Sequence, residues 1–179
     1  MNMNNKSKWI TETAIMIALL VVLQTITRGF GQFVTGSCVN FVLAMTTLLC
    51  GLSSAITVAV VSPFFAFVLG IGPAFLPIVP GISFGNTVLV VLLWFILGKY
   101  GSDACLTRKI AALIGSAVCK FLVLYLLITK IILPTLPLNE KQIGVISASF
   151  SWPQLVTAVI GVSLGILLWP QLKQAVTRK

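Results

Sequence analysis

Six apolar stretches, each long enough to cross a lipid bilayer, leave this 179-residue chain few ways to fold. A membrane-crossing helix needs about 20 predominantly apolar residues, so six of them use about 120 positions. None of the stretches carries an acidic residue at membrane depth, and Lys120 is the only charged residue near the middle of one. This pattern predicts a small multi-span membrane protein with a solute site and no ion-coupling group of its own.

The predicted fold is an all-α membrane protein, a compact bundle of six transmembrane helices in a single domain over residues 1–179. With 58% apolar and 8% charged residues the chain is unlike soluble proteins, and the short connectors place any ATP-driven motor on another chain. The helices are expected at residues 8–28, 33–52, 55–71, 82–97, 110–133 and 143–169. Pro63 is expected to kink the third helix and Trp152-Pro153 to break or bend the sixth.

The segment between the third and fourth predicted helices, residues 70–81, is apolar but rich in proline and glycine. Such a composition is incompatible with a regular helix. An apolar loop is expected to pack over a cavity and not to extend into water.

Basic residues are distributed unevenly between the connectors. With an inside amino terminus, eight lie on the cytoplasmic face and three on the outer face, which is the bias that orients spans during insertion. The eight are Lys6, Lys8, Lys99, Arg108, Lys109, Lys173, Arg178 and Lys179, and the three are Arg28, Lys130 and Lys141. We therefore expect a multi-pass cell-membrane protein with both termini cytoplasmic. Its net charge of +9 then reflects topology and contact with the lipid bilayer, and nucleic-acid binding is not expected.

The residue inventory argues against an enzyme. The chain has no histidine, and its three acids, Glu12, Asp103 and Glu140, lie near helix ends or in connectors. A carboxylate pair, a Ser–His relay or a metal-bound water cannot be assembled from these residues. The four cysteines form no Cys-x-x-Cys pair, so neither a metal nor another cofactor is expected.

Lys120 is the strongest individual signal. It lies about ten residues past the inner end of the fifth helix, or about 15 Å into the membrane. A lysine at this depth costs a few kcal/mol, so it should face the bundle interior and find a partner. It either binds a carboxylate or phosphate of a solute, or caps backbone carbonyls in a structural role. Because the chain offers no buried acid to pair it, the binding role is favoured.

Further polar and aromatic residues are predicted in the outer halves of the helices. Buried amides are costly unless they bond to each other, to backbone or to a ligand, and aromatic walls with a few polar groups are typical of small-molecule sites. With Lys120, the candidate substrate-binding residues are Gln32, Asn40, Asn86, Gln154, Tyr125, Phe84 and Trp152. Each polar residue could instead join two helices.

Three pairs of small residues are spaced four apart, which lets two helix backbones approach closely. They are Ala14/Ala18, Gly81/Gly85 and Gly161/Gly165. The alanine pair lies on the inner half of the first helix, where another membrane subunit could dock.

Two segments carry a resemblance to a known family: TETAIMIALLVVL at residues 11–23 and GLSSAITVAVVSPFFAFVLG at residues 51–70. With the chain length, the six predicted helices and the inside termini, they resemble the substrate-binding S components of energy-coupling factor (ECF) transporters. The resemblance implies that Ala14 and Ala18 contact a transmembrane coupling protein, and that two ATP-binding subunits energise uptake. It also implies a vitamin or related micronutrient, held by the outer halves of helices four to six and by outer loops one and three.

Two other classes stay open. A stand-alone facilitator or channel for small solutes should show a continuous polar stripe through several helices. A structural membrane assembly protein should pair all of its polar groups internally, and no ligand should stabilise it.

Overall fold

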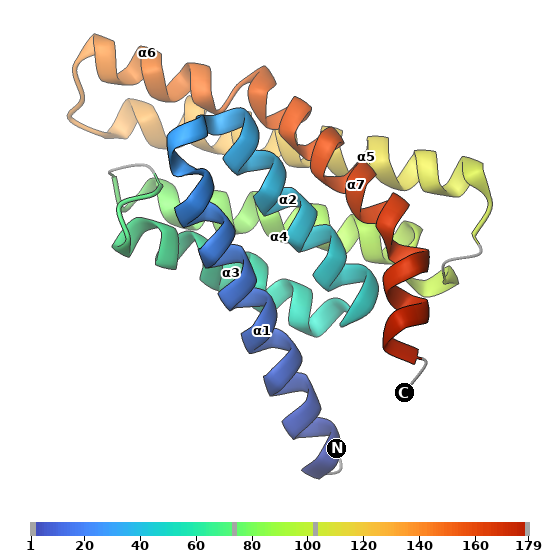
Figure 1. The fold of residues 1–179 in the computed structure, drawn as a ribbon. Coiled ribbons are helices and arrows are strands. Elements are labelled where there is room, and N and C mark those ends of the chain that lie inside the picture. The colour runs from blue at the N-terminus through green and yellow to red at the C-terminus, as the bar shows by residue number, and fades with distance from the viewer. Residues whose placement is uncertain (1–2, 73–74, 102–103, 178–179) are drawn as a thin grey trace.

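The computed structural model describes residues 3–72, 75–101 and 104–177, which are helical and contain no strand. The helices are α1 (Met3–Thr27), α2 (Gln32–Leu49), α3 (Leu52–Val68), α4 (Ile78–Ile96), α5 (Leu106–Leu124), α6 (Glu140–Ser149) and α7 (Trp152–Thr177) (Figure 1). Five helical stretches are long and apolar enough to cross a membrane, and the 17-residue α3 is a shorter apolar helix. The architecture is therefore compatible with a multi-pass membrane protein, while the side of the membrane that each terminus faces stays a prediction.

At two prolines the structure can be compared with the expected helix boundaries: it differs at Pro80 and confirms the break expected at Trp152-Pro153. Helix α4 begins at Ile78, four positions before the expected start, and includes Pro80 in its first turn. The expected sixth helix is two helices, separated at residues 150–151, and Pro153 lies in the first turn of α7. The first turn has no intrahelical acceptor for its N–H groups, so proline is tolerated there. These two prolines therefore lie at helix beginnings, and the prediction that residues 70–81 are entirely non-helical was wrong for residues 78–81.

The fifth predicted helix changes its winding part of the way along. Helix α5 ends at Leu124 and continues as a π-helix, η3 (Tyr125–Ile132), followed by a 3-10 turn, η4 (Leu133–Thr135). A π-helix turns the following side chains to a new angle, and such segments are frequent at functional sites. Ile128 of this segment is buried and lies close to Gly81 of α4.

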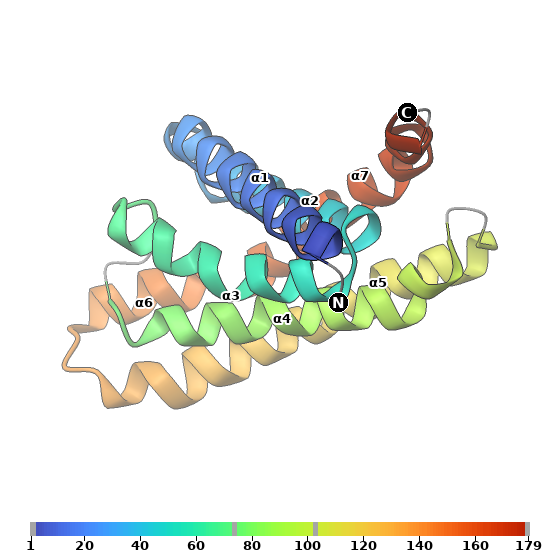
Figure 2. The ribbon, with the colours of Figure 1, turned by 90° about the horizontal axis from the view of Figure 1, so that it is seen from below.

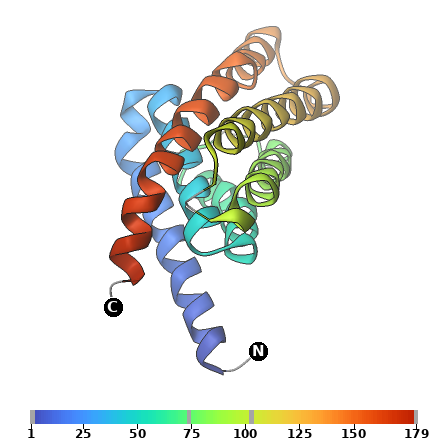
Figure 3. The ribbon, with the colours of Figure 1, turned by 90° about the vertical axis from the view of Figure 1, so that its right-hand side faces the viewer.

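Helix α2 lies at the centre of the bundle. It packs against α1, α3, α4 and α7, and all of its residues from Val42 to Leu48 are buried. Seen from below, α3 and α4 lie between α1 on one side and α5 on the other (Figure 2). The beginning of α1 and the end of α7 lie at the same end of the molecule (Figures 1 and 3).

Two of the three small-residue pairs are used inside the bundle. A Cβ atom added at Gly161 would lie 2.6 Å from the Asn40 Cβ, and one at Gly165 would lie 2.7 Å from the Ala44 Cβ. One added at Gly85 would lie 2.5 Å from the Leu124 side chain. The glycines therefore permit the close approach of α7 to α2 and of α4 to α5.

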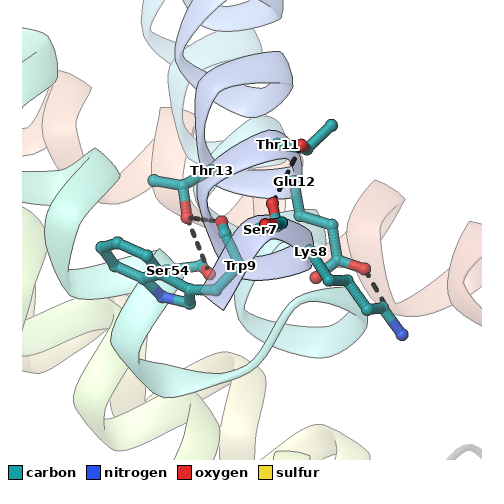
Figure 4. Close-up of polar contacts among 7 residues, drawn as sticks. All are labelled: Ser7, Lys8, Trp9, Thr11, Glu12, Thr13 and Ser54. Carbon is teal, nitrogen blue, oxygen red and sulfur yellow. Dashed lines mark hydrogen bonds and ion pairs between the residues drawn. The ribbon is translucent and has the colours of Figure 1, made fainter. Parts of the chain in front are cut away.

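The beginning of α1 is attached to α3 by side-chain hydrogen bonds (Figure 4). The Thr13 hydroxyl bonds to Ser54 Oγ at 2.9 Å, and Trp9 Nε1 donates to Ser53 Oγ at 3.1 Å. Glu12 forms an ion pair with Lys8 on the same helix, at 3.7 Å. These contacts fix which side of α1 faces the bundle and leave its other side exposed.

Candidate functional site

A cavity of about 410 Å³ lies at the end of the bundle opposite the first and last described residues. Helices α1 to α4 alternate in direction, so the ends of α1 and α3 meet the beginnings of α2 and α4 here (Figure 1). All seven α-helices contribute to its lining, and so do Ile71 and Gly72 of the apolar connector after α3. The volume falls within the range of about 300–1,000 Å³ that is typical of small-molecule sites.

Lys120 lies in the wall of this cavity and is only 2% exposed. Its Nζ donates hydrogen bonds to Asn40 Oδ1 at 2.5 Å and to Asn86 Oδ1 at 2.7 Å. An ammonium group carries three N–H donors, so one remains beyond the two asparagines. Three of the predicted site residues, from α5, α2 and α4, are thus brought into direct contact.

No negative charge lies beside this lysine in the described part of the chain. The two asparagine side chains are neutral, Glu12 pairs with Lys8, and Glu140 is exposed at the start of α6. The third acid, Asp103, lies outside the described residues. The ammonium is hydrogen-bonded but not neutralised, which gives the cavity a positive wall.

The orientation of Asn40 is fixed from its other side. Its Nδ2 donates to the Gly36 carbonyl oxygen at 2.9 Å and to Thr157 Oγ1 at 3.3 Å. The Thr157 hydroxyl in turn donates to the Gln154 carbonyl oxygen at 3.2 Å. The position of the lysine therefore depends on the packing of α2 against α7.

Gln32 and Gln154 line the cavity where α6 ends and α7 begins. Their Nε2 atoms both donate to the Ser149 carbonyl oxygen, at 2.5 Å and 3.2 Å. Carbonyls at a helix C-terminus lack intrahelical donors, so these two amides satisfy one of them and tie α2, α6 and α7 together. The two glutamines thus have a structural role at the rim of the cavity.

The three aromatic residues of the predicted site do not line this cavity. Phe84 and Trp152 are 57% and 60% exposed, and Trp152 packs on Phe33 with ring centroids 5.4 Å apart. Tyr125 packs on Phe121 instead. The physical reason is helical spacing: Phe84 precedes Asn86 by two residues, and such neighbours point about 200° apart. Trp152 has the same relation to Gln154. The cavity wall is therefore mostly aliphatic, and the aromatic residue that lines it is Phe150, which the sequence analysis did not select.

Two cavity residues that the sequence analysis did not select have polar atoms without a hydrogen-bond partner. Gln24 and Ser62 line the cavity, and their buried Oε1 and Oγ atoms are unpartnered. Arg28, treated above only as an outer basic residue, also lines the cavity. Gln24 and Arg28 are four residues apart and share a helix face, a spacing that could have drawn attention to them.

The fold and the cavity define a class of protein: an all-helical bundle with membrane-length apolar helices around a positively charged internal cavity. Comparisons with protein-family models, with curated proteins and with solved structures give no significant match. The function is therefore argued from the chemistry of the cavity.

Proposed function

We propose that this protein is the membrane-embedded capture subunit of an uptake system for a vitamin or related micronutrient. In this proposal the solute binds in the cavity, and a separate transmembrane coupling protein with two ATP-binding subunits energises its release. The observation that carries the proposal is Lys120, a buried ammonium held by two neutral amides in a cavity wall. A charge at membrane depth is costly, and a bound anion would compensate it.

The distribution of polar groups favours capture over passage through an open channel. On the side of the termini, the bundle is filled by buried apolar side chains that include Leu48, Leu93, Leu97 and Trp169. The hydroxyls of Thr46, Thr47 and Ser116 at this depth donate to carbonyls one turn earlier in their own helices. Within the described ranges, the polar lining therefore does not continue through the bundle as a channel requires.

The exposed side of α1 supports a docking role. Ala14 and Ala18 are both exposed, whereas the two glycine pairs with the same spacing are buried between helices. Small residues in the membrane allow close helix contact, so a free pair suits a partner helix. With both termini cytoplasmic, this surface would lie in the inner half of the membrane, remote from the cavity.

A thermal-shift screen of the purified protein against water-soluble vitamins and their precursors tests the capture role. Specific binding stabilises the folded state by RT ln(1 + [L]/Kd), about 4 kcal/mol at a thousandfold excess over Kd. We expect one chemical class to raise the melting temperature clearly. A folded protein that no compound in the panel stabilises would contradict the proposal and favour a structural assembly role.

Replacing Lys120 by methionine is expected to weaken binding of an acidic compound identified in that screen. The side chain keeps a similar length but loses the charge, so affinity should fall about tenfold or more, or at least about 1.4 kcal/mol. Titration calorimetry in detergent measures the change. The Lys130→Met variant removes an exposed charge from η3 and should bind as the unmodified protein does. Equal affinity of the Lys120→Met variant would assign that lysine a purely structural role.

A further inference from the structure

Two sides of the cavity carry polar groups that could still form hydrogen bonds. Lys120 has a remaining N–H donor on α5, whereas Gln24 Oε1 on α1 and Ser62 Oγ on α3 lack partners. Helix α5 packs against α4 and α7, while α1 and α3 pack against each other. Figure 2 shows α3 and α4 between α1 and α5, so the helices that carry Gln24 and Lys120 form different sides of the bundle.

The charge of the lysine wall fits a monoanion. Lys120 is the single buried cation among the lining residues, since Arg28 is exposed. A carboxylate bears one negative charge and accepts a charge-assisted hydrogen bond from an ammonium group. A phosphate group carries about −1.5 to −2 at neutral pH, which one buried ammonium would leave partly uncompensated.

The side of the cavity formed by α1 and α3 requires a hydrogen-bond donor. The carbonyl oxygen of a glutamine side chain can only accept, so a partner for Gln24 Oε1 must present an O–H or N–H group. Gln24 and Ser62 are 8% and 1% exposed, so bulk water does not readily satisfy them. The rest of the lining is largely apolar and includes Val39, Ile82, Ile146 and Phe150.

We infer that this cavity takes a small carboxylic acid whose other end carries a hydroxyl or N–H donor, joined by a short apolar segment. The carboxylate contacts Lys120 between Asn40 and Asn86, and the donor end contacts Gln24 Oε1 and Ser62 Oγ. The inference rests on the proposed capture function and narrows it to one chemical class.

Three matched series of probes test the inference on the unmodified protein. The first is ω-hydroxyalkanoic acids of increasing length, from hydroxybutanoate to hydroxyoctanoate. The second is the corresponding alkanoates, which lack the hydroxyl, and the third is the corresponding ω-hydroxyalkanamides, which lack the charge. At the best chain length, the hydroxy acid should bind about tenfold more tightly than either analogue, measured by calorimetry. An amide that binds as well as its acid, or an alkanoate that binds as well as its hydroxy acid, overturns the inference.

Variants assign the preference to individual residues. Gln24→Leu and Ser62→Ala should each reduce the advantage of the hydroxyl while the advantage of acid over amide persists. Thr129→Val is the matched control, because the Thr129 hydroxyl is also buried and unpartnered but lies outside the cavity lining. This variant should keep both preferences, and loss of the hydroxyl preference in Thr129→Val alone would contradict the assignment.

The outcomes separate this inference from the function on which it rests. Stabilisation by a vitamin in the thermal-shift screen, with no preference for acids over amides, would retain solute capture and reject the carboxylic-acid class. Failure of both the vitamin panel and the hydroxy acids to bind a folded protein would reject the two together.

Discussion

A single methyl group added at Gly161 is expected to lower the stability of the protein and weaken solute binding together. The added Cβ of a Gly161→Ala variant would lie 2.6 Å from the Asn40 Cβ, the Phe41 amide nitrogen and the Ser37 carbonyl oxygen. Two of these three atoms are backbone, so no side-chain rotation relieves the clash and α7 must move away from α2. Overpacking of this kind costs about 1–3 kcal/mol, and each kcal/mol lowers the melting temperature by about 2–4 °C at this chain length.

The effect on binding follows from the role of Asn40. This side chain holds the Lys120 ammonium through Oδ1 and contacts Thr157 of α7 through Nδ2. Separation of α2 from α7 therefore displaces the ammonium, and affinity for an acidic solute should fall about tenfold or more. Thermal unfolding and calorimetric titration of one detergent preparation measure both effects.

Gly144→Ala provides the matched control. A Cβ at Gly144, which lies in α6, would meet no atom within 4 Å. Alanine also suits a helix better than glycine, so this variant should melt at the same temperature as the unmodified protein or slightly above it. If the Gly161→Ala variant also melts unchanged and binds normally, α2 and α7 do not pack as closely as the structure indicates.

The sequence predicts the helical architecture well, but the place of a proline relative to a helix end only in part. Continuous apolar stretches of membrane length predict helices, because the backbone N–H and C=O groups of a segment in lipid must form hydrogen bonds within that segment. Proline is ambiguous, since it is unfavourable within a helix and favourable in its first turn. For this reason Pro80 was expected outside a helix and instead lies in the first turn of α4, whereas the expected break at Trp152-Pro153 is confirmed.

The sequence predicts those residues of the candidate site that can be selected by their expected depth in the membrane. Lys120 and the four amide residues were selected by depth, and all five line one cavity. Helical spacing, applied to Phe84 and Trp152, would have placed these aromatics on other faces. Ser62 could not have been selected in this way, because its place at the cavity depends on how α3 packs against the other helices, whereas Gln24 shares a helix face with Arg28.

Replacing Ala18 by tryptophan is expected to abolish uptake and leave solute binding unchanged. Ala18 is exposed on α1, and the hydrogen bonds that attach α1 to α3 involve Trp9 and Thr13. An indole at this position would prevent the close approach of a partner helix that small residues permit. The cavity residue of the same helix, Gln24, lies six residues further along, so the site should keep its geometry.

Two measurements on the same variants separate docking from binding. Uptake of the radiolabelled compound is followed in cells that supply the coupling protein and both ATP-binding subunits, and its affinity is measured on the purified variant. Ala14→Trp should behave as Ala18→Trp does, whereas Ala111→Trp introduces the same bulk at an exposed position on α5 and should transport normally. Loss of affinity in the α1 variants would show that α1 shapes the cavity and would reject the docking role. Normal uptake would place the partner on another face, since a tryptophan in a close helix contact has no room.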